Sequence, residues 1–179
     1  MVLVGFMGSG KSTVGRLLAD RLGWTYVDVD ATIEAGEGIS VAEIFRCRGE
    51  PYFRDVESRV TLELLGRDHV VLGSGGGWGA SARRLRDLPD GTTSVWLQVT
   101  PEEAVRRVSA AADERPLLAG GDPLETARRL MKTRVEEYAA ADVGVDTNAR
   151  TPEDVVLAIL EMIGDRSPDG TTARNVREA

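Results

Sequence analysis

Short apolar runs alternate with longer amphipathic stretches along the chain. The runs cover residues 1–4, 25–27, 69–72, 94–99 and 143–145, and they are rich in valine, leucine and other residues that favour strands. The stretches between them repeat apolar residues at helical spacing. Alternation of this kind is typical of a parallel sheet with helices on both faces. We therefore predict an α/β protein with five strands.

Helix boundaries follow from capping residues, glycines and prolines. The first helix is predicted to begin within residues 10–13 and to end at Gly23, because glycine stops helices. A capping residue followed by a proline or, three positions later, by a glutamate predicts further helices, and such signals occur at Ser40, Thr100, Asp122 and Thr151. Another helix is expected behind Pro51.

Residues 109–122 and 164–179 do not fit the pattern of strands and helices. The first stretch contains Pro116 and the pair Gly120-Gly121, and it is either a mobile lid or a plain connection between two helices. The second has almost nothing to bury, so we expect a disordered tail. Residues 1–163 are predicted to form a single domain.

Residues 5–12, Gly-Phe-Met-Gly-Ser-Gly-Lys-Ser, fit the pattern G-x-x-x-x-G-K-[ST] between a predicted strand and a predicted helix. Glycines let backbone N–H groups turn around phosphate oxygens, and the following helix presents its positive end to the same anion. Lys11 supplies a charge for the β- and γ-phosphates, and the Ser12 hydroxyl can ligate Mg²⁺. The motif predicts a nucleotide-binding loop. It leaves kinase, GTPase and ATPase open, although no guanine-reading Asn-Lys-x-Asp run is present.

Two further groups of residues follow predicted strands. Asp28 and Asp30 come directly after the second strand, and on an extended turn both carboxylates would face the crevice where open α/β sheets bind ligands. Taken alone, such a pair is more often a solvated loop or a helix cap than a functional site. Residues 75–77 are three consecutive glycines after the third strand. Close approach of a ligand to bare backbone explains such a run better than folding does.

The charge balance narrows the possible partners. With 22 basic and 29 acidic residues the net charge is −7, so a nucleic-acid or anionic-membrane surface is not expected. The single cysteine, Cys47, excludes an internal disulfide, and the single histidine, His69, is interpreted as a strand-edge residue rather than a metal ligand. No apolar run reaches the roughly 18 residues of a membrane span, and the first residues lack the basic start of a signal peptide. We expect a cytoplasmic monomer.

Taken in order along residues 1–163, these motifs resemble the shikimate kinase family, which transfers the γ-phosphoryl group of ATP to the 3-hydroxyl of shikimate. The resemblance rests on the nucleotide-binding loop, the two aspartates, the glycine run, Glu50-Pro51-Tyr52-Phe53-Arg54 with Glu57, Arg115-Pro116-Leu117-Leu118, and Val145-Asp146-Thr147-Asn148. It implies a three-layer α/β/α fold similar to that of nucleoside monophosphate kinases. The sheet would be parallel with strand order 2-3-1-4-5, and a lid would lie at about residues 109–122.

The resemblance also implies roles for particular residues. Lys11, Asp30 and Arg115 would be catalytic, with Asp30 as the candidate base and Arg115 meeting the transferring phosphoryl group from the lid. ATP would bind through Gly8, Ser9, Gly10, Lys11, Ser12, Thr13, Arg107, Arg115, Arg150 and Pro152, of which Arg107, Arg150 and Pro152 would flank adenine. Shikimate would bind through Asp30, Phe45, Phe53, Arg54, Glu57, Gly76, Gly77 and Arg134, with both arginines on its carboxylate. Mg²⁺ would be held by Ser12 and, through water, by Asp28.

Two departures from the family pattern bear on this site. Gly73 stands where the family has a serine or threonine, and Ser74, one place later, would aim differently, so a hydroxyl contact near the metal is expected to be lost. Trp78 replaces a small residue and would either narrow the substrate pocket or pack beneath it. The alternatives are a related kinase acting on aminoshikimate or gluconate, and a nucleotide-binding module that transfers nothing.

Overall fold

The computed structural model describes residues 1–110 and 122–164, in which five strands form one parallel sheet. The strands are β1 (Val2–Val4), β2 (Thr25–Asp28), β3 (Val70–Gly73), β4 (Ser94–Gln98) and β5 (Val143–Asp146). Their order across the sheet is β2-β3-β1-β4-β5, the order that the family resemblance implied. The predicted α/β architecture and its five strands are confirmed.

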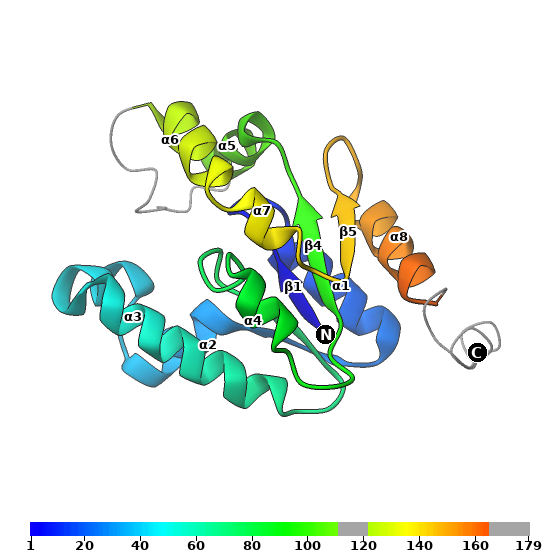
Figure 1. Ribbon diagram of the computed structural model, residues 1–179, viewed down its shortest axis with the longest axis horizontal. Helices are drawn as coiled ribbons and strands as arrows, with labels where there is room; N and C mark the ends of the chain where they lie inside the picture. Colours follow the sequence, from blue (N-terminus) through cyan, green and yellow to red (C-terminus); the bar gives the residue numbers. More distant parts are fainter. Residues whose placement is uncertain (111–121, 165–179) are drawn as a thin grey trace.

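Helices occupy the segments between the strands and cover both sides of the sheet (Figure 1). They are α1 (Lys11–Leu22), α2 (Val29–Glu37), α3 (Val41–Leu65), α4 (Ala82–Arg86), α5 (Pro101–Ala110), α6 (Pro123–Lys132), α7 (Val135–Tyr138) and α8 (Pro152–Gly164). None of these helices is long and apolar enough to cross a membrane.

Alternate residues of β1, β2, β3 and β4 point into two separate cores, because successive side chains of a strand face opposite sides of its sheet. Val2 and Val4 of β1 are fully buried in the core formed with α2, α3, α4 and α7. Leu3, between them, is buried in the core formed with α1 and α8. A third cluster, which includes Phe6 and Ala127, joins α5 and α6 near the carboxyl ends of the strands. The carboxyl edge of the sheet is therefore held between packed helices.

The helix starts predicted at the four capping residues are confirmed. α3, α5, α6 and α8 each begin one residue after the predicted cap. The strongest cap is reciprocal: the Asp154 N–H donates to Thr151 Oγ1 at 3.2 Å, and the Thr151 N–H donates to Asp154 Oδ2 at 3.3 Å. α1 ends before Gly23, which adopts the left-handed conformation with φ 67°.

Helix α3 is interrupted at Gly49, where the backbone leaves the helical region with φ 81° and ψ 167°. Pro51 then lies in the first turn of the second part, where its missing N–H removes no helical hydrogen bond. The interruption brings Phe45 of the first part against Phe53 of the second, with ring centroids 4.8 Å apart. The helices predicted after Ser40 and behind Pro51 are both present. That they form one helix interrupted at Gly49 was not predicted.

The predicted lid and tail fall mostly outside the described residues, which exclude 111–121, with Arg115, and 165–179. Within the predicted lid, Ser109 belongs to α5 and Asp122 caps α6. Gly164, the first residue of the predicted tail, is instead the last residue of α8. His69 lies directly before β3 with its ring edge-on to Trp24, in agreement with its interpretation as a strand-edge residue.

Candidate active site

The loop between β1 and α1 wraps around a point at the carboxyl edge of the sheet. Gly8 and Gly10 have φ values of 73° and 93°, in the region that favours glycine. A Cβ on Gly8 would also come within 2.7 Å of the Ala104 carbonyl oxygen of α5. Ser9 between them is fully buried, and its N–H donates to the Phe6 carbonyl at 3.2 Å. The loop is therefore fixed by its glycines in one tight path.

The amino end of α1 is arranged for an anion. Its first turn has no acidic residue, whereas the first turns of α2, α3, α5, α6 and α8 each have at least one. Lys11 begins this helix, and its Nζ donates to the carbonyls of Gly5 at 3.0 Å and Phe6 at 3.1 Å. Thr13 is exposed in the same turn. A positive helix end and an ammonium group at one loop favour phosphate groups.

Ser12 and Asp28 meet beside this loop. The Ser12 hydroxyl donates to Asp28 Oδ2 at 3.1 Å. Both are hard oxygen donors, which suit Mg²⁺, and Mg²⁺ generally keeps water and phosphate ligands in addition to one or two protein oxygens. Within residues 1–110 and 122–164 no group of three or more His, Cys, Asp or Glu could hold a metal. This donor set fits an ion shared with a nucleotide rather than one enclosed by protein.

The extended turn predicted for Asp28 and Asp30 was wrong. β2 ends at Asp28, and α2 begins at the next residue. Asp28 caps that helix, because its Oδ1 accepts from the N–H groups of Asp30 at 3.1 Å and Ala31 at 3.3 Å. Asp30 lies in the first turn of α2 and lines a pocket next to the loop. Asp28 therefore lies beside Ser12 and Asp30 in the neighbouring pocket, both at the carboxyl edge of the sheet, although α2 begins between them.

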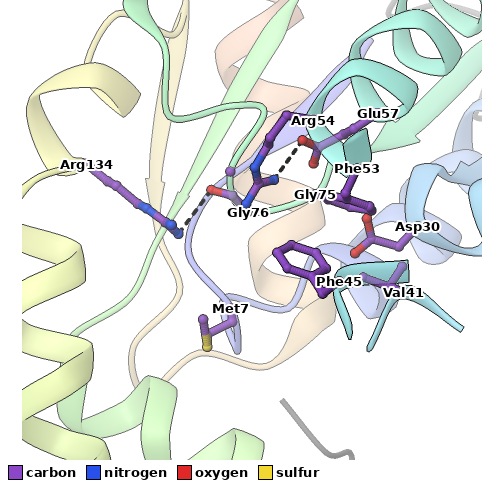
Figure 2. Close-up of a pocket in the computed structure, with 11 residues that line it drawn as sticks. Met7, Asp30, Val41, Phe45, Phe53, Arg54, Glu57, Gly75, Gly76 and Arg134 are labelled. Carbon is purple, nitrogen blue, oxygen red and sulfur yellow. Dashed lines mark hydrogen bonds and ion pairs between the residues drawn. The ribbon is translucent and has the colours of Figure 1, made fainter. Parts of the chain in front are cut away.

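A pocket of about 280 Å³ opens at this edge between α3, the glycine run and the start of α7 (Figure 2). It is lined by Met7, Asp30, Val41, Phe45, Phe53, Arg54, Glu57, Gly75, Gly76, Gly77 and Arg134. All eight residues that the sequence analysis assigned to substrate binding are among them. Met7 and Val41 were not predicted, since an apolar residue in a loop or at a helix start carries no signal of its own.

Two guanidinium groups reach the glycine run from opposite directions in this pocket (Figure 2). Arg134 Nη1 donates to the Gly76 carbonyl at 3.5 Å. The guanidinium of Arg54 lies so close to Gly77 that a Cβ there would overlap it. Arg54 comes from α3, and Arg134 caps α7, so segments far apart in the chain meet here. One small anion in the pocket would be within reach of both cations.

Arg54 is held by two glutamates of its own helix. Its Nη1 donates to Glu57 Oε2 at 2.8 Å, and its Nη2 donates to Glu50 Oε1 at 3.0 Å. Glu57 is 0% exposed, and its Oε1 has no hydrogen-bond partner among the described residues. Burial raises the pKa of the Glu57 carboxyl, and the charge of Arg54 opposes that rise.

The glycine run makes room for these side chains. A Cβ on Gly75 would overlap Glu57 Oε1, as one on Gly77 would overlap Arg54, so glycine at these two positions makes room for protein side chains. Gly76 has no atom closer than 3.7 Å to the position of a Cβ and faces the pocket. Its carbonyl accepts a hydrogen bond from the hydroxyl of Tyr138, whose pKa burial raises to about 12. The expected close approach of a ligand to the backbone of Gly76 and Gly77 remains a prediction, and both residues line the pocket.

The residues predicted to flank adenine lie at the ends of β4 and β5. Arg107 of α5 donates from Nη1 to the Gly8 carbonyl at 3.2 Å and from Nη2 to the Thr147 carbonyl at 2.7 Å, which ties the nucleotide-binding loop to the end of β5. Arg150 and Pro152 stand on either side of the start of α8, with Arg150 exposed. Arg115 lies outside the described residues.

The two departures from the family pattern have structural explanations. Ser74 directly follows β3, and its hydroxyl donates to the Leu3 carbonyl at 3.0 Å rather than to Asp28. The space beside Gly73 is filled by the hydroxyl of Tyr26, which the sequence analysis did not consider because an aromatic residue in a strand is usually core. Trp78 is 2% exposed and packs behind the glycine run, where it lines a second cavity and not the substrate-sized pocket.

Comparison with known proteins gives a consistent result. The sequence profile described as "Shikimate kinase" matches residues 7–164. The shikimate kinase of Persephonella marina is 44% identical over 161 residues, which cover 90% of this chain and 96% of that protein. The one from Moorella thermoacetica is 41% identical and covers 91% and 93%. The solved structure of shikimate kinase from Acinetobacter baumannii in complex with shikimate matches with a TM-score of 0.86 and 35% identity over 93% of each chain.

Proposed function

This chain belongs to the shikimate kinase family, and on that premise we propose that it transfers the γ-phosphoryl group of ATP to the 3-hydroxyl of shikimate. The products are shikimate 3-phosphate and ADP, in the route to the aromatic amino acids. The observation that carries the proposal is the pocket in which Arg54, Arg134 and Asp30 converge beside the nucleotide-binding loop.

Arg54 and Arg134 hold the carboxylate of shikimate. A guanidinium binds a planar carboxylate through two parallel hydrogen bonds, and such charge-assisted bonds are the stronger ones. Because the chain has a net charge of −7, an anionic substrate needs a local concentration of cations, and these two supply it. Phe45 and Phe53, which pack against each other, form the apolar wall for the ring.

Asp30 is the base of the proposed reaction. Its place in the lining of the same pocket as the two arginines, two residues after Asp28, supports this role. As the acceptor oxygen forms its bond to the γ-phosphorus, its proton passes to the Asp30 carboxylate. The bond between the γ-phosphorus and the bridging oxygen breaks, and ADP leaves with that oxygen.

The loop of residues 8–13 binds the phosphates of ATP through backbone N–H groups and the amino end of α1. Lys11 would contact the β- and γ-phosphates, and Ser12 and Asp28 would hold Mg²⁺, with Asp28 acting through water. When bound, Mg²⁺ neutralises charge on the β- and γ-phosphate oxygens. Arg107, Arg150 and Pro152 flank adenine, and Arg115 meets the transferring phosphoryl group from the lid at about residues 109–122.

We further propose that the enzyme works as a cytoplasmic monomer with no nucleic-acid or membrane partner. The net charge of −7 supports the absence of a polyanionic partner. Size-exclusion chromatography with light scattering measures the mass directly, and a mass near 19.3 kDa is expected. A dimeric mass would contradict this part of the proposal.

An ADP-release assay tests the activity. We expect ATP turnover that depends on both Mg²⁺ and shikimate, and phosphate on the 3-hydroxyl of the product by NMR. Aminoshikimate and gluconate are the matched acceptors for the rival kinase functions, and a higher kcat/KM with either would overturn the assignment. Tight ATP binding with no acceptor-dependent turnover would instead favour the nucleotide-binding module.

A further inference from the structure

The side chain of Tyr26 fills a space that two glycines leave between α1 and the sheet. A Cβ on Gly15 of α1 would overlap its ring, and a Cβ on Gly73 of β3 would overlap its hydroxyl oxygen. Neither glycine has a positive φ, so the backbone conformation does not require glycine at either position. The absence of both side chains is explained by the presence of the tyrosine.

The hydroxyl of Tyr26 forms a hydrogen bond with the carboxylate of Asp28. It donates to Asp28 Oδ2 at 3.1 Å, the same oxygen that accepts from the Ser12 hydroxyl at 3.1 Å. The other oxygen, Oδ1, accepts from two backbone N–H groups at the start of α2. Each oxygen of Asp28 therefore has two donors, and the plane of the carboxylate is fixed.

Of the two donors on Oδ2, only Tyr26 lies outside the nucleotide-binding loop. The Ser12 hydroxyl must also serve a metal ion when one is present, so its bond to Asp28 changes with the state of the site. Tyr26 is held by packing against α1 and β3 and by the Arg16 guanidinium, whose Cζ lies 5.5 Å from the ring centroid. It is the donor that keeps Oδ2 turned towards Ser12.

We propose that Tyr26 is a positioning residue for the Mg²⁺ end of the active site, where its phenol holds the Asp28 carboxylate in the orientation that receives the metal's water. The inference rests on the proposed roles of Ser12 and Asp28. It also makes Tyr26 and Gly73 a coupled pair, because a side chain on β3 and the phenol on β2 exclude each other from one position beside Asp28.

Tyr26→Phe tests the proposal, since it keeps the ring between the two glycines and removes one oxygen. ADP affinity is measured by calorimetry with Mg²⁺ and again with EDTA. We expect the Kd for ADP to rise about 10- to 100-fold in Mg²⁺ and to stay within about twofold in EDTA, because loss of one hydrogen bond to a charged group acts only through the metal. An equal change in both conditions, or no change in either, would overturn it.

Tyr52→Phe is the matched control. Its hydroxyl bonds to Glu37, away from the nucleotide-binding loop, so its removal should leave both ADP affinities unchanged.

A second comparison uses a rescue variant. Tyr26→Leu removes the phenol from the space between the two glycines, and the added Gly73→Ser returns a hydroxyl from β3. We expect the double variant to bind ADP more tightly than Tyr26→Leu when Mg²⁺ is present, and equally tightly in EDTA. Equal affinities of the two variants in Mg²⁺ would contradict the proposal.

Failure of the proposed function has a different signature. A wild-type protein that binds ADP in a Mg²⁺-dependent manner but does not phosphorylate shikimate contradicts the assigned acceptor and leaves the Tyr26 result valid. A wild-type protein whose ADP affinity is the same in Mg²⁺ and EDTA contradicts the metal roles of Ser12 and Asp28, and with them the role of Tyr26.

Discussion

Among the described residues, Arg134 makes weaker contacts than Arg54, the other cation in the pocket. Its hydrogen bond to the Gly76 carbonyl is long, at 3.5 Å, and its Cζ lies 5.9 Å from the centroid of the Phe6 ring. Arg54, in contrast, is bonded to two glutamates. Within residues 1–110 and 122–164, Arg134 has no ion pair of the kind that holds Arg54, so it can turn to a ligand more readily.

Replacing Arg134 by alanine is expected to weaken acceptor binding selectively. Loss of one charge-assisted hydrogen bond costs about 1.5–3 kcal/mol, so the KM for shikimate should rise roughly 10- to 150-fold, with the KM for ATP nearly unchanged. Steady-state kinetics with each substrate varied in turn measures both values. Arg129→Ala, an exposed arginine of α6, is the control. Equal rises for shikimate and ATP would remove Arg134 from the carboxylate site.

The buried carboxyl of Glu57 makes stability depend on pH. Its pKa in the folded state is raised by burial, so its contribution to the free energy of unfolding is present below the unfolded value of about 4.3 and is lost as pH rises through the folded pKa. Glu57→Gln does not titrate. The free energy of unfolding of this variant, relative to wild type, should therefore increase between about pH 4 and pH 7.

Urea unfolding at the two pH values measures that difference. Glu63→Gln is the control, because Glu63 lies on the same helix with its side chain 72% exposed. A difference that decreases with pH would mean that the pairing with Arg54 outweighs burial.

At the scale of elements, the interruption of α3 gives the pocket its shape. Phe45 lies before Gly49, whereas Phe53, Arg54 and Glu57 lie after it, and a continuous helix would not bring Phe45 and Phe53 to a centroid distance of 4.8 Å. The φ and ψ values of Gly49 fall in a region that is essentially restricted to glycine. One residue thus controls the angle between the two walls of the pocket.

Gly49→Ala is expected to destabilise the protein by about 1–3 kcal/mol, the cost of a strained backbone position, and to raise the KM for shikimate. Gly36→Ala is the matched control, since Gly36 lies in α2 with nothing within 4 Å of a Cβ and has no positive φ. That change should be neutral or stabilising by up to about 1 kcal/mol. Denaturant unfolding of both variants compares them, and equal stabilities would show that Gly49 is not strained.

The sequence predicted the elements better than their junctions. Periodic apolar residues and reciprocal caps such as Thr151 with Asp154 act locally, so strands and helix starts were readable. The extended turn expected around Asp30 failed because the Asp28 cap starts α2 without a loop. Tyr26 was missed because its partner Gly73 is 47 positions away and only sheet pairing brings β2 beside β3. That Arg54 and Arg134 line one pocket was predicted from the family resemblance, since apolar periodicity carries no information on which arginines meet.

At the scale of the whole molecule, the site lies where separately packed regions adjoin. The core with α2, α3 and α4 supplies Asp30 and Arg54, the core with α1 and α8 supports the nucleotide-binding loop, and the third cluster includes Met7 at its margin. A ligand in the pocket contacts residues supported by more than one of these regions. Its binding free energy therefore adds to the stability of the fold as a whole.

Shikimate should raise the melting temperature of the protein. At a concentration 100 times its Kd the gain is about 2.7 kcal/mol, or roughly 5 to 11 °C for a domain of this size. Differential scanning fluorimetry measures the shift, and gluconate at the same concentration is the control ligand. A shift with gluconate that matches or exceeds the shift with shikimate would contradict the assignment of the acceptor.

The pairing of Arg54 with Glu50 and Glu57 has a consequence for competing anions. An arriving carboxylate does not meet a bare cation; it competes for Arg54 with Glu50, whose side chain is 58% exposed, and with the buried Glu57. Such competition leaves little net gain for chloride, which has a single point of attachment. An acid whose ring hydroxyls find further partners gains more from the same site, so chloride salts should be poor inhibitors of this enzyme.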